Sequence, residues 1–124
     1  MIMLDTHVAV SLYEGRTGGL STRAKRELER GMVRISPAIM LELEILNEIG
    51  RVRPRAVAIA ASLQEQLGVR IATEPFADIV AEALGLAFTR DPFDRLIVAH
   101  AALLKAPLIT FDEQLRRHYP RAMN

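Results

Sequence analysis

Four acidic residues that are far apart in the chain are the side chains best suited to act together in chemistry. Three of them follow a short apolar run or fall in the first turn of a predicted helix, and the fourth lies on the apolar side of a helix. Carboxylate oxygens are the ligands that hard divalent cations prefer. A shared metal site is therefore predicted if the fold brings these side chains together: Asp5, Glu42, Asp94 and Asp112.

Glu42 is the most informative of the four. At 100° per residue it lies on the apolar side of the helix expected over residues 36–49. A carboxylate on such a face needs a cation, an arginine partner or a proton. A salt bridge to an arginine is therefore the alternative to metal binding, whereas Glu44 and Glu48 point the other way and are expected to be solvated. The apolar neighbours of Glu42 on this face are Ile39, Ile45, Leu46 and Ile49.

The three aspartates also have a structural explanation as helix caps. Asp5 and Asp112 each precede a predicted helix, and Asp94 follows the cap Asp91 by three positions, in its helix's first turn. Such groups stabilise a helix start by roughly 1 kcal/mol each. Asp94 also borders an apolar stripe, so we expect its carboxylate to be partly desolvated. Capping and metal binding are compatible roles.

Apolar runs alternating with helical patterns predict how these residues are positioned. Strands are expected at 1–4, 32–35, 69–72 and 108–111, and helices at 7–13, 21–30, 36–49, 54–67, 74–84, 91–105 and 112–117. This alternation predicts one α/β domain over residues 1–124, a three-layer α/β/α sandwich with a mostly parallel sheet of four to five strands. Little room remains for a fifth strand after Tyr119 and Pro120. Ligands gather at the carboxyl ends of such strands, where Asp5 and Asp112 lie.

The composition excludes several classes of protein. Half of the residues are hydrophobic and a quarter are charged, as in folded globular proteins. No apolar run is long enough for a membrane span, and no secretory signal is evident, so we expect a cytoplasmic protein. The absence of Cys excludes disulfides and thiolate metal sites. No phosphate-binding glycine motif occurs, so no nucleotide cofactor is expected, and His100 is interpreted as a hydrogen-bonded core residue.

Taken together, four segments resemble the PIN-domain ribonucleases, in particular the VapC-like toxins of toxin–antitoxin pairs. The segments occur in the family's order and spacing across nearly the whole chain. The start of the helix predicted at 91–105, Asp-Pro-Phe-Asp-Arg-Leu at 91–96, is typical of one branch. Thr89 departs from the family, where a histidine is common, and His100 stands where a glutamine is usual. The matching segments are 3–7, 35–43, 90–99 and 108–112.

The resemblance implies a function and a set of roles. It implies an Mg²⁺- or Mn²⁺-dependent endoribonuclease acting on structured or single-stranded RNA, usually a homodimer, whose partner is a small antitoxin that inserts a segment near the acidic site. Thr6 and Thr110 match polar positions beside the metal ligands, and Asp91 is an additional acidic neighbour. The phosphates of RNA need basic partners, for which we consider the arginines at 23–34 and 51–55, and most specifically Arg95, Arg23 and Arg26.

Two other interpretations remain open. A catalytically inactive PIN-like binding module would have the same fold, although it has no reason to keep Glu42 on an apolar face. A Mg²⁺-binding phosphotransfer or signalling domain would need an acidic pair after the first strand and a late lysine at a strand end. The solitary Asp5 and the position of Lys105 argue against that class.

Overall fold

Five short strands form one parallel sheet in the computed structural model, which describes residues 1–124. The strand order is β3-β2-β1-β4-β5, and every neighbouring pair is parallel. The central strands β1 and β4 contain only buried apolar residues, which suits a sheet that is covered on both faces. The strands are β1 (Ile2–Leu4), β2 (Val33–Ile35), β3 (Arg70–Ile71), β4 (Leu108–Ile109) and β5 (Ala122–Met123).

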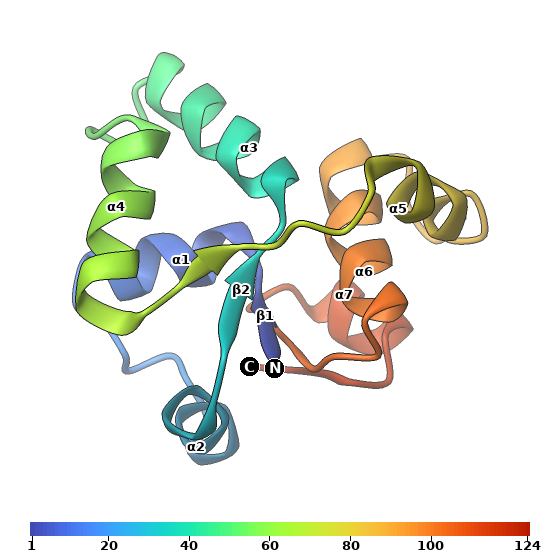
Figure 1. Cartoon of the computed structure of the whole chain (residues 1–124), viewed down its shortest axis with the longest axis horizontal. Coiled ribbons are helices and arrows are strands. Elements are labelled where there is room, and N and C mark those ends of the chain that lie inside the picture. Colours follow the sequence, from blue (N-terminus) through green and yellow to red (C-terminus); the bar gives the residue numbers. More distant parts are fainter.

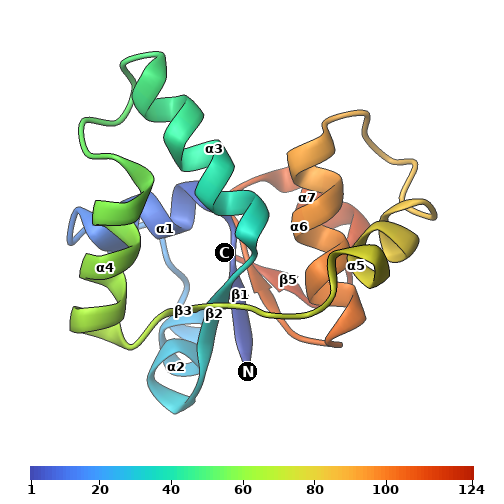
Figure 2. The ribbon, with the colours of Figure 1, turned by 45° about the horizontal axis from the view of Figure 1, so that its top comes forward.

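Seven helices flank the sheet, and they divide between its two sides (Figures 1 and 2). On one side α1, α3 and α4 contact one another, and on the other side α5 packs on α6, with α7 nearby. The predicted three-layer α/β/α sandwich is therefore confirmed. The helices are α1 (Thr6–Tyr13), α2 (Thr22–Arg30), α3 (Pro37–Glu48), α4 (Ala56–Leu67), α5 (Phe76–Ala83), α6 (Pro92–Leu103) and α7 (Glu113–His118).

The strand order reverses between β1 and β4. From β1 the chain builds outward through β2 to β3, and it then returns to the other side of β1 to add β4 and β5. Leu4 is in register with both Ile35 and Ile109, so these three strands end at the same level. The residues that follow them, Asp5 among them, therefore share one edge of the sheet, where open α/β folds bind ligands.

The core is mainly aliphatic, with Tyr119 as its one buried aromatic residue. Ile39 and Leu43 of α3 and Ile59 and Leu63 of α4 are buried against the sheet. Burying each such side chain stabilises the fold by roughly 1.5–3 kcal/mol. None of the helices combines the length and apolar character needed to cross a bilayer.

The elements differ from the prediction mainly at their ends. The fifth strand, for which the sequence left little room, forms as β5, and the Thr110 N–H donates to the Met123 carbonyl at 2.8 Å. Helix α4 begins at Ala56 and not at Pro54, because the Ala56 N–H donates to the side chain of Glu44 at 3.1 Å. β4 is shorter than expected and ends at Ile109.

Candidate metal centre

A pocket of about 400 Å³ lies where β1, β4, α3 and α6 meet at the carboxyl edge of the sheet. Five of its seven lining residues are acidic, and neither lysine nor arginine lines it. All four predicted carboxylates contribute, although they come from distant parts of the chain. The lining residues are Asp5, His7, Glu42, Asp91, Asp94, Phe111 and Asp112.

Two threonines hold the buried carboxylate of Asp5 in place in this pocket. Its Oδ1 accepts the Thr6 N–H at 2.8 Å, as the predicted cap of α1, and its Oδ2 accepts the Thr110 hydroxyl at 2.6 Å. Only 6% of Asp5 is exposed. Burial raises the pKa of Asp5, and the Thr110 hydrogen bond opposes that shift. Both predicted threonines therefore lie beside the acidic site, with one contact each to Asp5.

Glu42 is half-buried and has no arginine partner. Its Oε1 accepts the hydroxyl of Thr6, and no ion pair involves it. Burial raises the pKa of Glu42, and the negative charge of Asp5 raises it further. The alternative of a Glu42–arginine salt bridge is therefore wrong. Ile49, expected on the buried side of this helix, is 60% exposed because α3 extends beyond the core.

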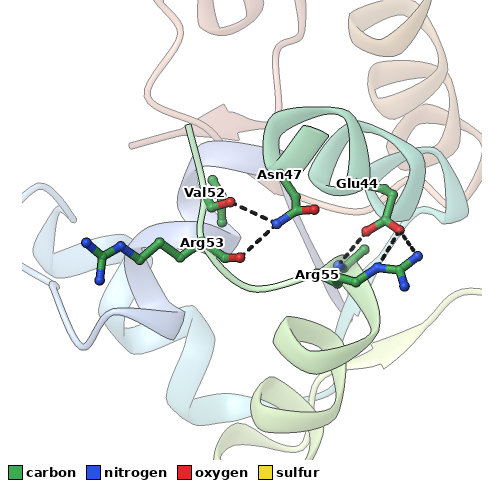
Figure 3. A network of polar contacts seen from close by, with 6 residues as sticks. Glu44, Asn47, Val52, Arg53 and Arg55 are labelled. Carbon is green, nitrogen blue, oxygen red and sulfur yellow. Dashed lines mark hydrogen bonds and ion pairs between the residues drawn. The ribbon is translucent and has the colours of Figure 1, made fainter. Parts of the chain in front are cut away.

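The salt bridge on α3 belongs to Glu44. Its Oε2 accepts Nε and Nη2 of Arg55 at 3.0 and 2.6 Å, and its Oε1 accepts the N–H of Ala56 (Figure 3). The prediction that Glu44 is a solvated charge is thus wrong, because α4 packs beside that face of α3. Glu48 is exposed, as expected.

Asp94 has the most strongly perturbed acid–base equilibrium in the pocket. Burial and the negative charges of its acidic neighbours raise the pKa of Asp94 from 3.8 to about 7. The predicted cap Asp91 accepts the N–H groups of Phe93 and Asp94 at 2.9 and 3.1 Å, which fixes the start of α6. Asp94 is therefore held half-buried where a negative charge is unfavourable. The neighbours that raise its pKa are Asp91, Asp5, Asp112 and Glu42.

Asp112 stands at the start of α7 and caps it as predicted. Its Oδ1 accepts the N–H groups of Gln114 and Leu115 at 2.8 and 3.3 Å. The N–H of Asp112 donates to the Thr110 hydroxyl oxygen at 3.0 Å. Thr110 thus contacts both Asp5 and Asp112, which links two of the acidic residues across β1 and β4.

The donor set of the pocket suits a hard divalent cation. Five of the seven lining residues offer carboxylate oxygens, the ligand type that Mg²⁺ and Mn²⁺ prefer. No three of the His, Asp and Glu side chains are already grouped closely enough to hold an ion. The type of donor atom therefore suits such a cation, but the positions of the side chains do not yet do so. Coordination requires that these side chains rotate toward one another.

The predicted basic residues lie outside the acidic pocket. Arg95 is half-buried and donates from Nε and Nη2 to the Ala83 carbonyl at 3.3 and 2.9 Å, which ties α6 to α5. Arg23 and Arg26 are exposed on α2, and neither lines the pocket. Lys105 follows α6 and does not line the pocket either.

His100 is a fully buried core histidine, as expected. Its Nδ1 lies 3.0 Å from the Ser36 hydroxyl, and its Nε2 lies 2.7 Å from Oε1 of Glu74. Since Ser36 caps α3, this contact joins the helix of Asp94 to the start of the helix of Glu42.

Two lining residues were not identified from the sequence. His7 has no partner at metal-binding spacing in the sequence, yet it lies two positions after Asp5, and its charge lowers the pKa of Asp5 and of Glu42. Phe111 directly precedes Asp112. Proximity in sequence to an acidic candidate is the signal that would have identified both.

The family model described as PIN domain matches residues 2–119 of this chain. A toxin–antitoxin complex from Klebsiella pneumoniae is similar in structure, with 20% identity, a TM-score of 0.66 and coverage of 100% of this chain and 97% of the other. VapBC2 from Rickettsia felis, bound to a promoter DNA fragment, has 17% identity, a TM-score of 0.70 and coverage of 99% and 96%.

DNA-bound VapBC from Salmonella typhimurium has 21% identity, a TM-score of 0.64 and coverage of 99% and 96%. At these identities the structural likeness supports the fold alone. No curated protein matches the chain.

Proposed function

Since the chain belongs to the PIN domain family, we propose that it is a metal-dependent endoribonuclease and the toxin of a toxin–antitoxin pair. One observation carries the enzymatic part of this proposal. Five acidic side chains from four separate parts of the chain line one pocket at the point where the strand order reverses, and no lysine or arginine lines it. Such a concentration of negative charge is costly unless a cation is bound.

The acidic residues have distinct places in the proposed site. Asp5, Asp94 and Asp112 would hold the cation directly, and Glu42 directly or through water. Thr6 and Thr110 orient Glu42 and Asp5 by hydrogen bonds, and Asp91 fixes the start of α6. Bound Mg²⁺ or Mn²⁺ would polarise the scissile phosphodiester and lower the pKa of an attacking water.

The protein contributes positioning and a defined electrostatic environment. The Thr110 hydrogen bond keeps one oxygen of the buried Asp5 in a fixed direction. The raised pKa of Asp94, about 7, means that this carboxyl is protonated in about half of the molecules at neutral pH and would lose that proton on binding a cation. The fully ionised form of these carboxyl groups is therefore favoured only when a cation is bound.

Single-stranded or looped RNA is the substrate that we favour. A phosphodiester bond must reach a pocket of about 400 Å³ between α3 and α6. Unpaired RNA can be splayed into such a site, whereas the deep groove of an RNA duplex cannot be entered by side chains. Structured RNAs qualify through their loops.

The proposed partners are a small antitoxin protein and a second copy of the chain. The similar structures from Klebsiella pneumoniae, Rickettsia felis and Salmonella typhimurium are described as toxin–antitoxin or VapBC complexes, which supports the antitoxin proposal. Expression of this chain alone is expected to arrest growth, and co-expression of a neighbouring small gene product is expected to relieve it. Sedimentation of the purified protein tests the homodimer.

Cleavage of a mixed RNA pool tests the enzymatic proposal. Wild-type protein is expected to produce fragments with Mg²⁺ or Mn²⁺ and none in EDTA, and Asp94→Asn is expected to reduce the rate on the order of 100-fold. Asp78→Asn is the matched control, because Asp78 is exposed in the first turn of α5 and lies outside the pocket.

The possible results separate the interpretations. Cleavage that persists in EDTA, or that is unchanged in Asp94→Asn, would overturn the metal mechanism. RNA binding without cleavage under any condition would instead support a catalytically inactive PIN-like binding module.

A further inference from the structure

The acidic pocket cannot hold an RNA chain by itself. Its lining includes five carboxylates and no lysine or arginine. A bound dication neutralises charge at one phosphate, but the flanking phosphates of the same strand still meet a negative surface. Positive side chains outside the pocket are therefore needed to hold the nucleotides on either side.

The turn between α3 and α4 is held in one conformation by hydrogen bonds from α3. The N–H groups of Arg51 and Val52 both donate to the Leu46 carbonyl, at 2.8 and 3.2 Å. The side-chain amide of Asn47 donates to the carbonyls of Val52 and Arg53 at 3.2 and 2.7 Å (Figure 3). Val52 is half-buried and packs against the core, so the turn is anchored on its inner side.

Hydrogen bonds to Glu44 hold the other end of the turn, where α4 begins. This carboxylate accepts two hydrogen bonds from the guanidinium of Arg55 and one from the Ala56 N–H. Arg55 is therefore occupied within the protein. The backbone between α3 and α4 is fixed at both ends, so little conformational entropy is lost when a ligand binds to it.

Arg51 and Arg53 differ from Arg55 because their side chains have no partner in the protein. Both are exposed, and neither forms an ion pair or a side-chain hydrogen bond. In Figure 3 the Arg53 side chain extends away from Asn47 and from the Glu44–Arg55 pair. A fixed turn thus presents two free guanidinium groups on either side of the inward-facing Val52.

This turn is joined rigidly to the acidic pocket. Glu42 lies on α3, which ends at Glu48, and Arg51 follows that end by three residues. The helical part from Glu42 to Glu48 is roughly 9 Å long. In Figures 1 and 2 the α3–α4 turn lies beyond the carboxyl end of β2, at the opposite end of the molecule from α2. The turn that carries the two arginines is therefore at the carboxyl end of the strands, as the pocket is.

We propose that Arg51 and Arg53 bind backbone phosphates of the substrate RNA a few nucleotides from the bond that is cleaved. The inference rests on the proposed ribonuclease function and identifies a contact of that function outside its acidic pocket. Guanidinium groups pair well with phosphate oxygens, and such contacts hold a strand without reading its sequence. Val52, which lies between the two arginines, faces inward and leaves both guanidinium groups accessible.

The salt dependence of RNA binding tests this contact. In an Asp94→Asn background with EDTA, where no cleavage is expected, Arg51→Ala/Arg53→Ala is expected to weaken binding of a labelled RNA of about 20 nucleotides on the order of ten-fold. Loss of two phosphate contacts should lower the slope of log affinity against log salt by about 1.4. Lys25→Ala/Arg70→Ala makes the same charge change at exposed positions outside the acidic pocket and is expected to leave the slope unchanged.

Substrate length gives an independent readout. In the wild-type background, Arg51→Ala/Arg53→Ala should lower kcat/KM on the order of ten-fold for the long RNA and leave cleavage of a dinucleotide unchanged, because the short substrate does not reach the turn. Arg51→Lys/Arg53→Lys should retain most of the salt slope. Equal slopes in the Arg51→Ala/Arg53→Ala and parent proteins, or equal losses for both substrates, would overturn the proposal.

The design separates failure of this contact from failure of the ribonuclease proposal. If wild-type protein cleaves RNA but the Arg51→Ala/Arg53→Ala variant binds and cleaves like the parent, only the contact is wrong. If wild-type protein cleaves no RNA, the ribonuclease proposal fails, and the slope of the binding experiment still decides whether the two arginines contact phosphates.

Discussion

The Thr110 hydroxyl donates a 2.6 Å hydrogen bond to Oδ2 of Asp5, across the two strands between which the strand order reverses. The same hydroxyl oxygen accepts the N–H of Asp112 at 3.0 Å. One buried threonine thus sets the relative positions of two proposed metal ligands that are more than one hundred residues apart in the chain. The site depends on this pairing of β1 with β4.

Replacement of Thr110 by valine tests that dependence. Thr110→Val keeps the shape but leaves a buried oxygen of Asp5 without its donor, which is expected to lower the free energy of unfolding by about 1–3 kcal/mol. Thr110→Ser keeps the hydroxyl and should lose only the contribution of a methyl group, about 0.8 kcal/mol. Urea denaturation measures both. Equal losses in the two variants would show that the hydrogen bond does not matter.

Neutralising Asp94 is expected to stabilise the protein in EDTA while strongly reducing its metal-dependent activity. Burial and like charges raise the pKa of Asp94, so its charged form is unfavourable in the folded protein at pH 8. After allowance for solvent screening of this half-exposed group, Asp94→Asn should raise Tm by about 4 °C, or roughly 1 kcal/mol. If Asp94 served only to stabilise the start of α6, Asp94→Asn would lower Tm. A lower Tm in the variant would therefore support that helix-capping role alone.

The raised pKa of Asp94 also predicts how stability in EDTA depends on pH. Between its unfolded value of 3.8 and its folded value of about 7, the folded protein binds a proton that the unfolded chain does not. Stability should therefore rise as pH falls from 8 to 5. Burial raises the pKa values of Asp5 and Glu42 too, which adds in the same direction.

Thermal unfolding at several pH values, with and without Mg²⁺, measures this effect. Because the cation must displace the proton, stabilisation by Mg²⁺ should be greatest above pH 7. The Asp94→Asn variant should show a weaker pH dependence. An identical pH profile in wild type and variant would contradict the assignment of this titration to Asp94.

Asp112 allows capping to be separated from metal binding. Asparagine is as good a helix cap as aspartate, so Asp112→Asn should keep the two hydrogen bonds that begin α7 and most of the stability. Asp112→Ala should lose about 1 kcal/mol. Both variants should lose metal-dependent cleavage. Retained cleavage in Asp112→Asn would leave this residue with a capping role only.

The position of the site could be predicted from the sequence because local signals and topology agreed. Apolar runs followed by capping residues placed Asp5 and Asp112 at strand ends, and a parallel sheet brings such ends to one edge. Helical periodicity placed Glu42 on a partly buried face. These three features depend on spacing along the chain, which a sequence contains.

The partners of each side chain could not be predicted in the same way. A helical wheel gives the direction of Glu44 but not the neighbouring helix, so its pairing with Arg55 of the α3–α4 turn was missed. Likewise, β5 has only two residues, and it is defined by its hydrogen bonds to β4 more than by its own composition. Contacts between elements follow from packing, which spacing does not encode.

Direct measurement of Mn²⁺ binding tests the central claim that these carboxylates form one cation site. In a titration followed by electron paramagnetic resonance, wild-type protein is predicted to bind Mn²⁺ competitively with Mg²⁺, and Asp5→Asn and Asp94→Asn are each predicted to weaken binding at least about ten-fold, while Asp78→Asn does not. Undiminished binding in both site variants, or no binding by wild-type protein, would contradict the account.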